Sequence, residues 1–130
     1  MKHHQQADQL EQRLIRFAVQ IIRFSATLPK NRVGRHISTQ ILRCGTSGAA
    51  NYAEARGAES RSDFIHKLGI VRKELNETAV WLKIVAEDVA IKSENIVAVI
   101  EENLELARII SASIRTARSS SGAPKMTTDQ

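Results

Sequence analysis

Basic residues gather in one stretch of the chain, where their charge could bind a polyanion. The chain of 130 residues has a formal net charge of +5. Residues 30–56 hold five basic residues and one acidic residue, Glu54. Clustered positive charge favours binding to phosphate backbones, because each neutralised phosphate releases counterions. The stretch therefore predicts an RNA-binding or DNA-binding set, with a merely solvated helix face as the alternative: Lys30, Arg32, Arg35, Arg43 and Arg56.

A second group of polar residues, in and just after this stretch, suits a structural role. Asn51 falls beside an apolar stripe, where a buried amide must find hydrogen-bond partners. Arg43 and Glu54 can supply charged hydrogen bonds across a junction between helices or subunits. We expect a structural polar cluster here rather than a catalytic one, made of Arg43, Asn51, Glu54 and Asp63.

The other reactive residue types do not form a pattern typical of an active site. The single cysteine, Cys44, lies among small and apolar residues, with no histidine or helix N-terminus placed to activate its thiol. Helical glutamates are present, but none belongs to the Glu-x-x-His pairs that di-iron bundles use. No glycine-rich phosphate loop is visible. The sequence therefore predicts no catalytic residues, no cofactor and no metal site, and the scattered histidines agree: His3, His4, His36 and His66.

Apolar residues spaced by four and three predict four helices that position these groups. The first spans residues 9–28, with Asp8 as its N-cap and Pro29 ending it. The second follows the short link 29–32, turns its arginines away from its apolar face, and ends at Gly57. That face runs through Val33, Ile37, Ile41, Cys44, Gly48, Tyr52 and Ala55. The third follows a capping box at residues 60–63 and keeps its seam as far as residue 89. The fourth begins at Ser93.

Two features of these helices predict close packing beyond a simple amphipathic bundle. Gly45 and Gly48 lie inside the second helix, where each weakens an isolated helix by roughly 1 kcal/mol relative to alanine. Close approach of another helix or subunit would recover that loss. The fourth helix has two apolar lines, although a helix with one solvent-exposed face needs only one. We therefore expect its extra apolar surface to close an oligomer. One line holds Val97, Ile100, Leu104, Ala107 and Ile114, and the other Ile96, Val99, Leu106 and Ile110.

Short links between four helices predict an all-α, antiparallel, up-down-up-down four-helix bundle over residues 9–118. A solenoid of two hairpins is disfavoured because the two halves show no repeat. We expect residues 1–8 to be a flexible N-terminus and residues 119–130 a disordered tail. With one cysteine, no apolar leader and no apolar run of about 20 residues, the chain is expected to be soluble and cytoplasmic, without a membrane role.

The middle of the chain resembles a family of small bacterial four-helix-bundle proteins first noticed in intervening sequences of 23S ribosomal RNA genes. The resemblance is specific over residues 43–63 and continues through residues 65–82, which read IHKLGIVRKELNETAVWL. Outside this region only the apolar pattern is similar. One departure is that Ala55 and Arg56 precede Gly57, where the family places glycine sooner after its asparagine and glutamate. The residues that carry the match are Arg43, Ser47, Asn51, Glu54, Arg56 and Asp63.

The resemblance implies a left-handed bundle that assembles as a ring-shaped homopentamer. Related accessory factors of diversity-generating retroelements are similar basic barrels that bind nucleic acid and partner with a reverse transcriptase. Two interpretations of this chain stay open. It is either an oligomeric module that contacts RNA or DNA backbones, or a structural adaptor ring that holds another protein, such as a polymerase, and has no nucleic-acid role.

Overall fold

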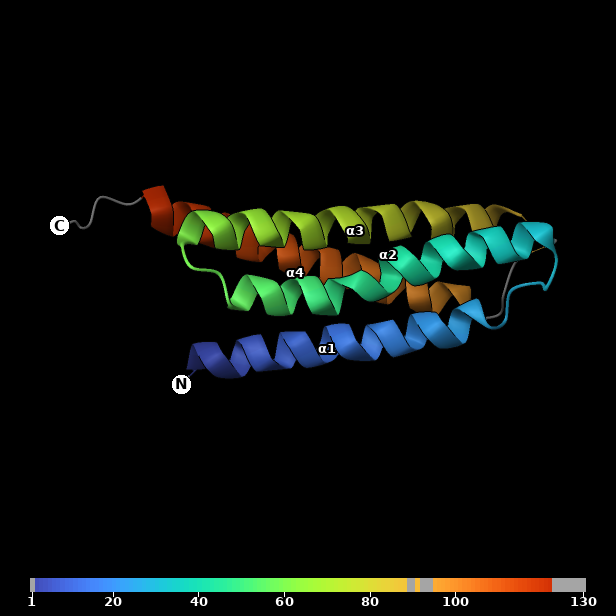
Figure 1. Cartoon of the computed structure of the whole chain (residues 1–130), viewed down its shortest axis with the longest axis horizontal. Helices are drawn as coiled ribbons and strands as arrows, with labels where there is room; N and C mark the ends of the chain where they lie inside the picture. The colour runs from blue at the N-terminus through green and yellow to red at the C-terminus, as the bar shows by residue number, and fades with distance from the viewer. Residues whose placement is uncertain (1, 89–90, 92–94, 123–130) are drawn as a thin grey trace.

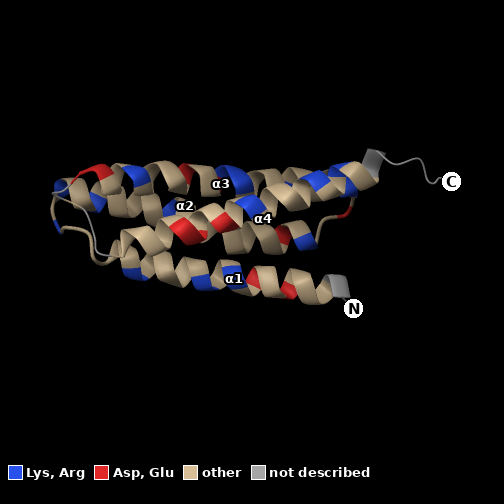
Figure 2. Cartoon of the chain, turned by 180° about the vertical axis from the view of Figure 1, so that it is seen from behind, with Lys and Arg blue, Asp and Glu red and all other residues tan. Residues whose placement is uncertain are grey.

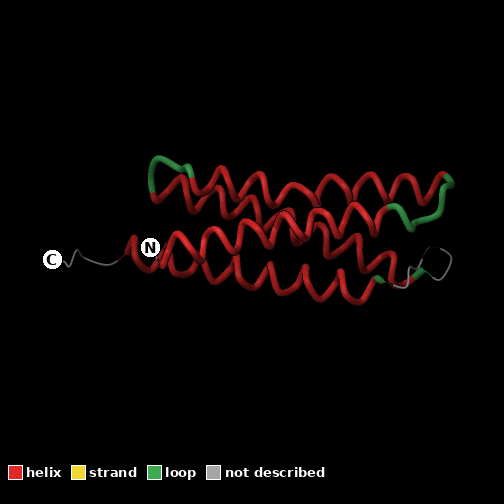
Figure 3. The backbone as a smooth tube through the Cα atoms, turned by 90° about the horizontal axis from the view of Figure 1, so that it is seen from below, coloured by secondary structure: helices red, strands yellow, loops and turns green. Residues whose placement is uncertain are grey.

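The fold consists of four α-helices, as the computed structural model of residues 2–88, 91 and 95–122 shows. They are α1 (Lys2–Ser25), α2 (Arg32–Arg56), α3 (Arg61–Glu87) and α4 (Ile96–Gly122). Across the described residues there is no strand (Figure 3). In Figure 1, α1 and α3 run in one direction along the long axis, and α2 and α4 run in the other. The predicted all-α, four-helix fold is confirmed.

Each helix packs along its neighbour in the sequence, whereas α1 and α4 contact each other much less extensively. One stripe of every helix faces the common core. The stripe of α3 matches the predicted seam, with Leu68, Val71, Leu75 and Leu82 almost completely buried. On the part of the chain that the structure describes, no helix has the length and hydropathy needed to cross a bilayer.

The glycines of α2 face α1, as the prediction of close packing required. A Cβ atom on Gly45 would lie 2.9 Å from side-chain atoms of Ile21, and one on Gly48 would lie 3.3 Å from Cδ2 of Leu14. Gly34 is tighter still, because a Cβ atom there would collide with the carbonyl oxygen of Pro29. Because Gly45 and Gly48 have no side chain, α2 can approach α1 closely. Gly34 likewise leaves room for the chain to reverse direction between the two helices.

Helix α1 begins earlier and ends earlier than the sequence pattern indicated. It starts at Lys2, so the predicted helix start at residue 9 is wrong. Asp8 is not an N-cap but lies within the helix, where its carboxylate pairs with Arg56 of α2 at 2.9 Å. This contact holds the first turns against the bundle. The helix ends at Ser25, and a turn follows in which Leu28 N donates to Ser25 O at 3.2 Å.

The remaining helix ends show which local signals were reliable. Asn31 caps α2, since its Oδ1 accepts from Gly34 N at 2.9 Å. Ser60 caps α3 as predicted, its Oγ accepting from Asp63 N at 3.0 Å. The predicted start of the fourth helix at Ser93 lies outside the described residues. Helix α4 continues to Gly122, so the predicted tail boundary at residue 119 is wrong, and residues 123–130 lie outside the described range.

Two helix faces differ in detail from the pattern. On α2, Val33 was expected on the inner face but is 54% exposed, because Gly34 occupies that position instead. On α4, the line that begins with Ile96 and Val99 faces the core. The line that begins with Val97 is exposed at Val97 and Leu104. The prediction is wrong for Ile114 of this line, which is fully buried, while Ile100 and Ala107 are partly buried against the core.

Candidate functional site

Arg43 is held by carboxylates of α3. Its guanidinium pairs with Glu77 in a short contact and with Glu74 at 3.5 Å, and it also donates to Gln40 Oε1 at 3.2 Å. The hydrogen bond with Glu77 raises the pKa of Arg43, which fixes the positive charge. Two acidic partners offset that charge. Arg43 therefore joins α2 to α3 and offers little to a phosphate backbone.

Arg56 is held in the same way by α1. Its guanidinium meets Asp8 at 2.9 Å and Glu11 at 3.0 Å. Hydrogen bonds, first with Asp8 and then with Glu11, raise the pKa of Arg56. Two of the five residues predicted to bind nucleic acid are thus ion-paired between helices.

The predicted polar cluster is spread over separate contacts. Glu54 lies 3.9 Å from Lys67 of α3 and does not contact Arg43. Asp63 lies in the first turn of α3, where its backbone N–H donates to the Oγ of the N-cap residue Ser60. Asn51 is half-buried, and within the described residues its side chain makes no hydrogen bond to the protein. Arg43 makes charged hydrogen bonds to α3, whereas Glu54 reaches α3 only through the longer ion pair with Lys67.

Lys30, Arg32 and Arg35 form a basic group without acidic partners in the part of the chain that the structure describes. Lys30 Nζ donates to Ala26 O at 2.8 Å, and Arg35 donates to Lys30 O at 2.8 Å. Arg32 is exposed. We call these three residues the turn cluster, because they lie where α1 passes into α2. Figure 2 shows basic residues at this end of the bundle, near an acidic segment at the end of α3.

A bridge between α1 and α4 was not predicted from the sequence. Arg13 Nε and a terminal nitrogen of Arg13 donate to the two carboxylate oxygens of Glu102 at 2.7 and 2.9 Å. This hydrogen bonding raises the pKa of Arg13. Since 89 residues separate the partners, no local pattern could reveal the pair.

Cys44 and Asn103 are buried groups whose chemistry is structural. Cys44 is buried, as predicted, and burial raises the pKa of its thiol, so the nucleophilic thiolate is disfavoured. Asn103 lies in the seam of α4 and donates its Nδ2 to Leu75 O of α3 at 3.0 Å. In the described residues, no group of three or more His, Cys, Asp or Glu side chains is arranged to hold a metal ion.

Comparison with known proteins identifies the family. The sequence profile of the 23S rRNA-intervening sequence protein family matches residues 8–112. A crystal structure from Bacteroides thetaiotaomicron, described as a protein with unknown function from the S23 ribosomal protein family, is similar to this one. It has 34% sequence identity and a TM-score of 0.76, over 84% of this chain and 97% of that chain. No curated protein is significantly similar. The chain therefore belongs to the 23S rRNA-intervening sequence protein family.

Proposed function

We propose that this protein is a non-enzymatic assembly module whose copies join head to tail through two different apolar surfaces. The observation that supports this proposal is the exposure of aliphatic side chains in regular lines. On α1 these are Ile15, Val19 and Ile22, the α1 stripe, and on α4 they are Val97 and Leu104, the α4 stripe. Burying apolar surface in a contact contributes about 25 cal/mol per Å².

The bridge between Arg13 and Glu102 supports placing the two stripes on different flanks. These two side chains mark the sides of α1 and α4 that face each other. Ile15 and Leu104 each stand two residues further along, and two residues turn a side chain by about 200° around the helix axis. Both stripes therefore point away from the junction of α1 with α4.

Two different surfaces on one chain favour a head-to-tail contact, which repeats until a ring closes. We propose that left-handed, antiparallel bundles assemble in this way into a ring-shaped homo-oligomer in the cytoplasm. Five subunits is the number that the family resemblance favours. In this proposal the ring is a scaffold, and no step of chemistry is assigned to it.

Two double variants test the head-to-tail contact. Ile15→Glu with Ile22→Glu breaks the α1 stripe, and Val97→Glu with Leu104→Glu breaks the α4 stripe. In sedimentation velocity we expect each variant alone to be a monomer. An equal mixture should give a heterodimer, because each variant keeps the surface that the other has lost.

The control is Val33→Glu, which places the same charge at an exposed valine outside both stripes and should leave the oligomer mass unchanged. The proposal is wrong if the unmodified chain is a monomer at tens of micromolar. It is also wrong if either double variant still self-associates, since that would indicate contacts between like surfaces.

A second candidate function, binding of RNA or DNA backbones, is favoured by the turn cluster. Lys30, Arg32 and Arg35 carry positive charge that no carboxylate offsets within the described residues. Repetition around a ring would raise the local field and strengthen salt-dependent binding. Arg43 and Arg56 are left out of this proposal, because acidic partners hold them.

Fluorescence anisotropy with labelled duplex RNA and DNA at two salt concentrations tests this candidate. Arg32→Gln with Arg35→Gln should weaken binding and lower its salt dependence, whereas the control Arg43→Gln should leave both unchanged. An absence of binding at low salt would reject the candidate. It would leave the ring as an adaptor for a protein partner, for which a polymerase is the class that the family resemblance favours.

A further inference from the structure

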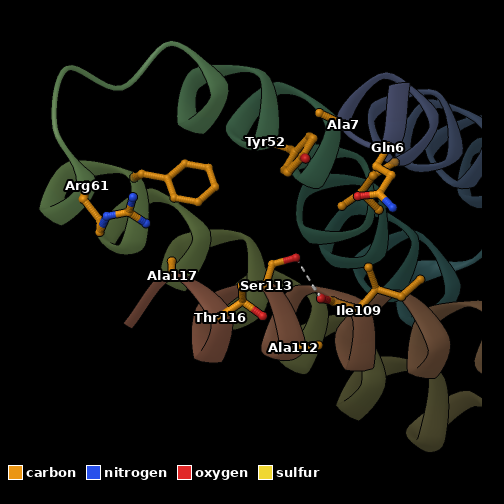
Figure 4. A pocket seen from close by; sticks show the side chains of 11 residues that line it. Gln6, Ala7, Tyr52, Arg61, Ile109, Ala112, Ser113, Thr116 and Ala117 are labelled. Atoms are coloured by element: carbon orange, nitrogen blue, oxygen red, sulfur yellow. Dashed lines mark hydrogen bonds between the residues drawn. The ribbon is translucent and has the colours of Figure 1, made fainter. Parts of the chain in front are cut away.

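A cavity of about 600 Å³ opens at the end of the bundle where α1 and α3 begin. All four helices contribute to its walls, which Figure 4 shows from close by. Leu10, Phe64 and Ile109 supply apolar surface, and Tyr52 adds a ring that is buried except for 6% of its surface. The volume falls in the range of about 300–1,000 Å³ that is usual for small-molecule sites.

The cavity exists because α1 and α4 do not close tightly at this end. Their contact is the least extensive of the four between neighbouring helices, and Arg13 and Glu102 bridge it. Ala112 lines the cavity from α4 with a side chain too short to reach across. A second, smaller cavity of about 190 Å³ lies along the same junction. The space thus follows from the packing of the helices.

The charge of the cavity lining has one sign. Among the described residues that line it, Arg61 is the charged one and none is an aspartate or glutamate. Arg13, Arg43 and Arg56 each pair with a carboxylate of another helix. For Arg61 no carboxylate lies within ion-pair distance in the residues that the structure describes. Its guanidinium is therefore available to an anion from outside the chain.

The charged residue of the lining lies at one end of the cavity. Figure 4 shows Arg61 at one end, and Gln6 and Ile109 at the other. Ser113 donates its hydroxyl to Ile109 O at 3.1 Å, so its oxygen keeps acceptor capacity but has no spare proton. The first residue of α3 is Arg61, where the positive end of the helix dipole adds to its charge. An anionic group is favoured at this end, and Leu10, Phe64 and Ile109 offer apolar surface to the body of a ligand.

We propose that this cavity binds a small amphiphilic carboxylate, with its carboxylate on Arg61 and its hydrocarbon body against Phe64, Leu10 and Ile109. A guanidinium can bind a carboxylate through two parallel hydrogen bonds, which gives the contact strength and direction. Burial of the hydrocarbon supplies the remaining affinity. This site is independent of the proposed ring, since it uses neither stripe and none of the turn cluster.

Isothermal titration calorimetry of the full chain with three probes of equal chain length tests the proposal. The probes are decanoate, decanol and decyltrimethylammonium, which carry negative, no and positive charge. We expect decanoate to bind about tenfold more tightly than decanol and the ammonium probe to bind least. Equal affinity for all three would overturn the proposal, as would a lack of decanoate binding at millimolar concentration.

Two variants and a control assign the binding to this cavity. Arg61→Gln should weaken decanoate binding about tenfold and leave decanol binding unchanged, because only the charged contact is lost. Ala112→Trp fills the cavity from an exposed helix position and should abolish binding of both probes. The control Arg115→Gln removes an exposed arginine of α4 outside the cavity and should change nothing. If Arg61→Gln and Arg115→Gln behave alike, the proposed role of Arg61 is wrong.

Discussion

Helix α1 packs against α2 through the smallest residues of the chain and against α4 through some of the longest. Gly45 and Gly48 let α2 approach until Ile21 and Leu14 fill the space above them. On the other side, an arginine and a glutamate bridge α1 to α4, and two cavities lie along the junction. The difference teaches that residue size at a junction decides whether it becomes sealed core or an opening that a ligand can enter.

The largest loss of stability is expected at Gly34, at the turn where α2 begins to pack against α1. Gly34→Ala should destabilise the fold by about 3 kcal/mol, because its Cβ would collide with the backbone oxygen of Pro29, which cannot move like a side-chain end. The free energy of unfolding in urea measures this. Gly57→Ala is the control, since its Cβ would meet nothing closer than 3.7 Å. Equal stability of the two variants would show that the turn between α1 and α2 adapts.

A smaller effect is expected at Gly45. Gly45→Ala should destabilise by about 1–2 kcal/mol, because the contact with Ile21 outweighs the roughly 1 kcal/mol that alanine adds in a helix. Gly69→Ala is the matched control in α3. Its Cβ would meet nothing within 4 Å, so this change should stabilise by about 1 kcal/mol.

A second substitution at Ile21 tests whether its contact with Gly45 limits the approach of the two helices. Ile21→Val removes one methyl group above the glycine, so it should restore part of the stability of Gly45→Ala in a double-mutant cycle. If the two changes add without coupling, the contact of Ile21 with Gly45 is not what limits the approach of α2 to α1.

The bridge on the open side should contribute less than either glycine contact. A double-mutant cycle of Arg13→Gln and Glu102→Gln should give a coupling of about 0.5–1 kcal/mol, because both side chains are partly exposed and the solvent screens them. Added salt should reduce it. The pair of Arg108 and Glu105, which lies within one helix and is more exposed, serves as the control and should couple more weakly. A larger coupling in the control pair would contradict this ranking.

The smallest expected effect is on how the free energy of unfolding depends on pH. Burial raises the pKa of Cys44 above its ordinary value of 9.0, so the folded state binds the thiol proton more tightly than the unfolded state. The stability from this group is complete below about pH 9 and is lost as the pH rises through the raised pKa of the folded state. Cys44→Ala should therefore show a shallower loss of stability between neutral and alkaline pH in urea titrations. Parallel curves would contradict a buried, neutral thiol.

The sequence predicted the elements of this fold well and its surfaces poorly. The seam of α3 and the cap at Ser60 were right, because both depend on residues within a few positions of each other. The start of α1 was wrong, because the contact that holds its first turns is with Arg56, far along the chain. The prediction for the inner face of α2 was wrong at Val33, which is exposed. Gly34 takes the inward position instead, because it lies against Pro29 in the turn before the helix.

The sequence by itself determined four amphipathic helices, a buried Cys44 and a glycine face on α2, because helical periodicity and residue size are local properties. The tertiary structure alone decided which charges remain available. Arg43 and Glu77 are 34 residues apart in sequence, and their pairing depends on how α2 and α3 are rotated and aligned. The same relative positions of four helices place Arg61 at the mouth of an apolar cavity. A periodic pattern gives each helix a face, but only packing decides which groups from different helices meet.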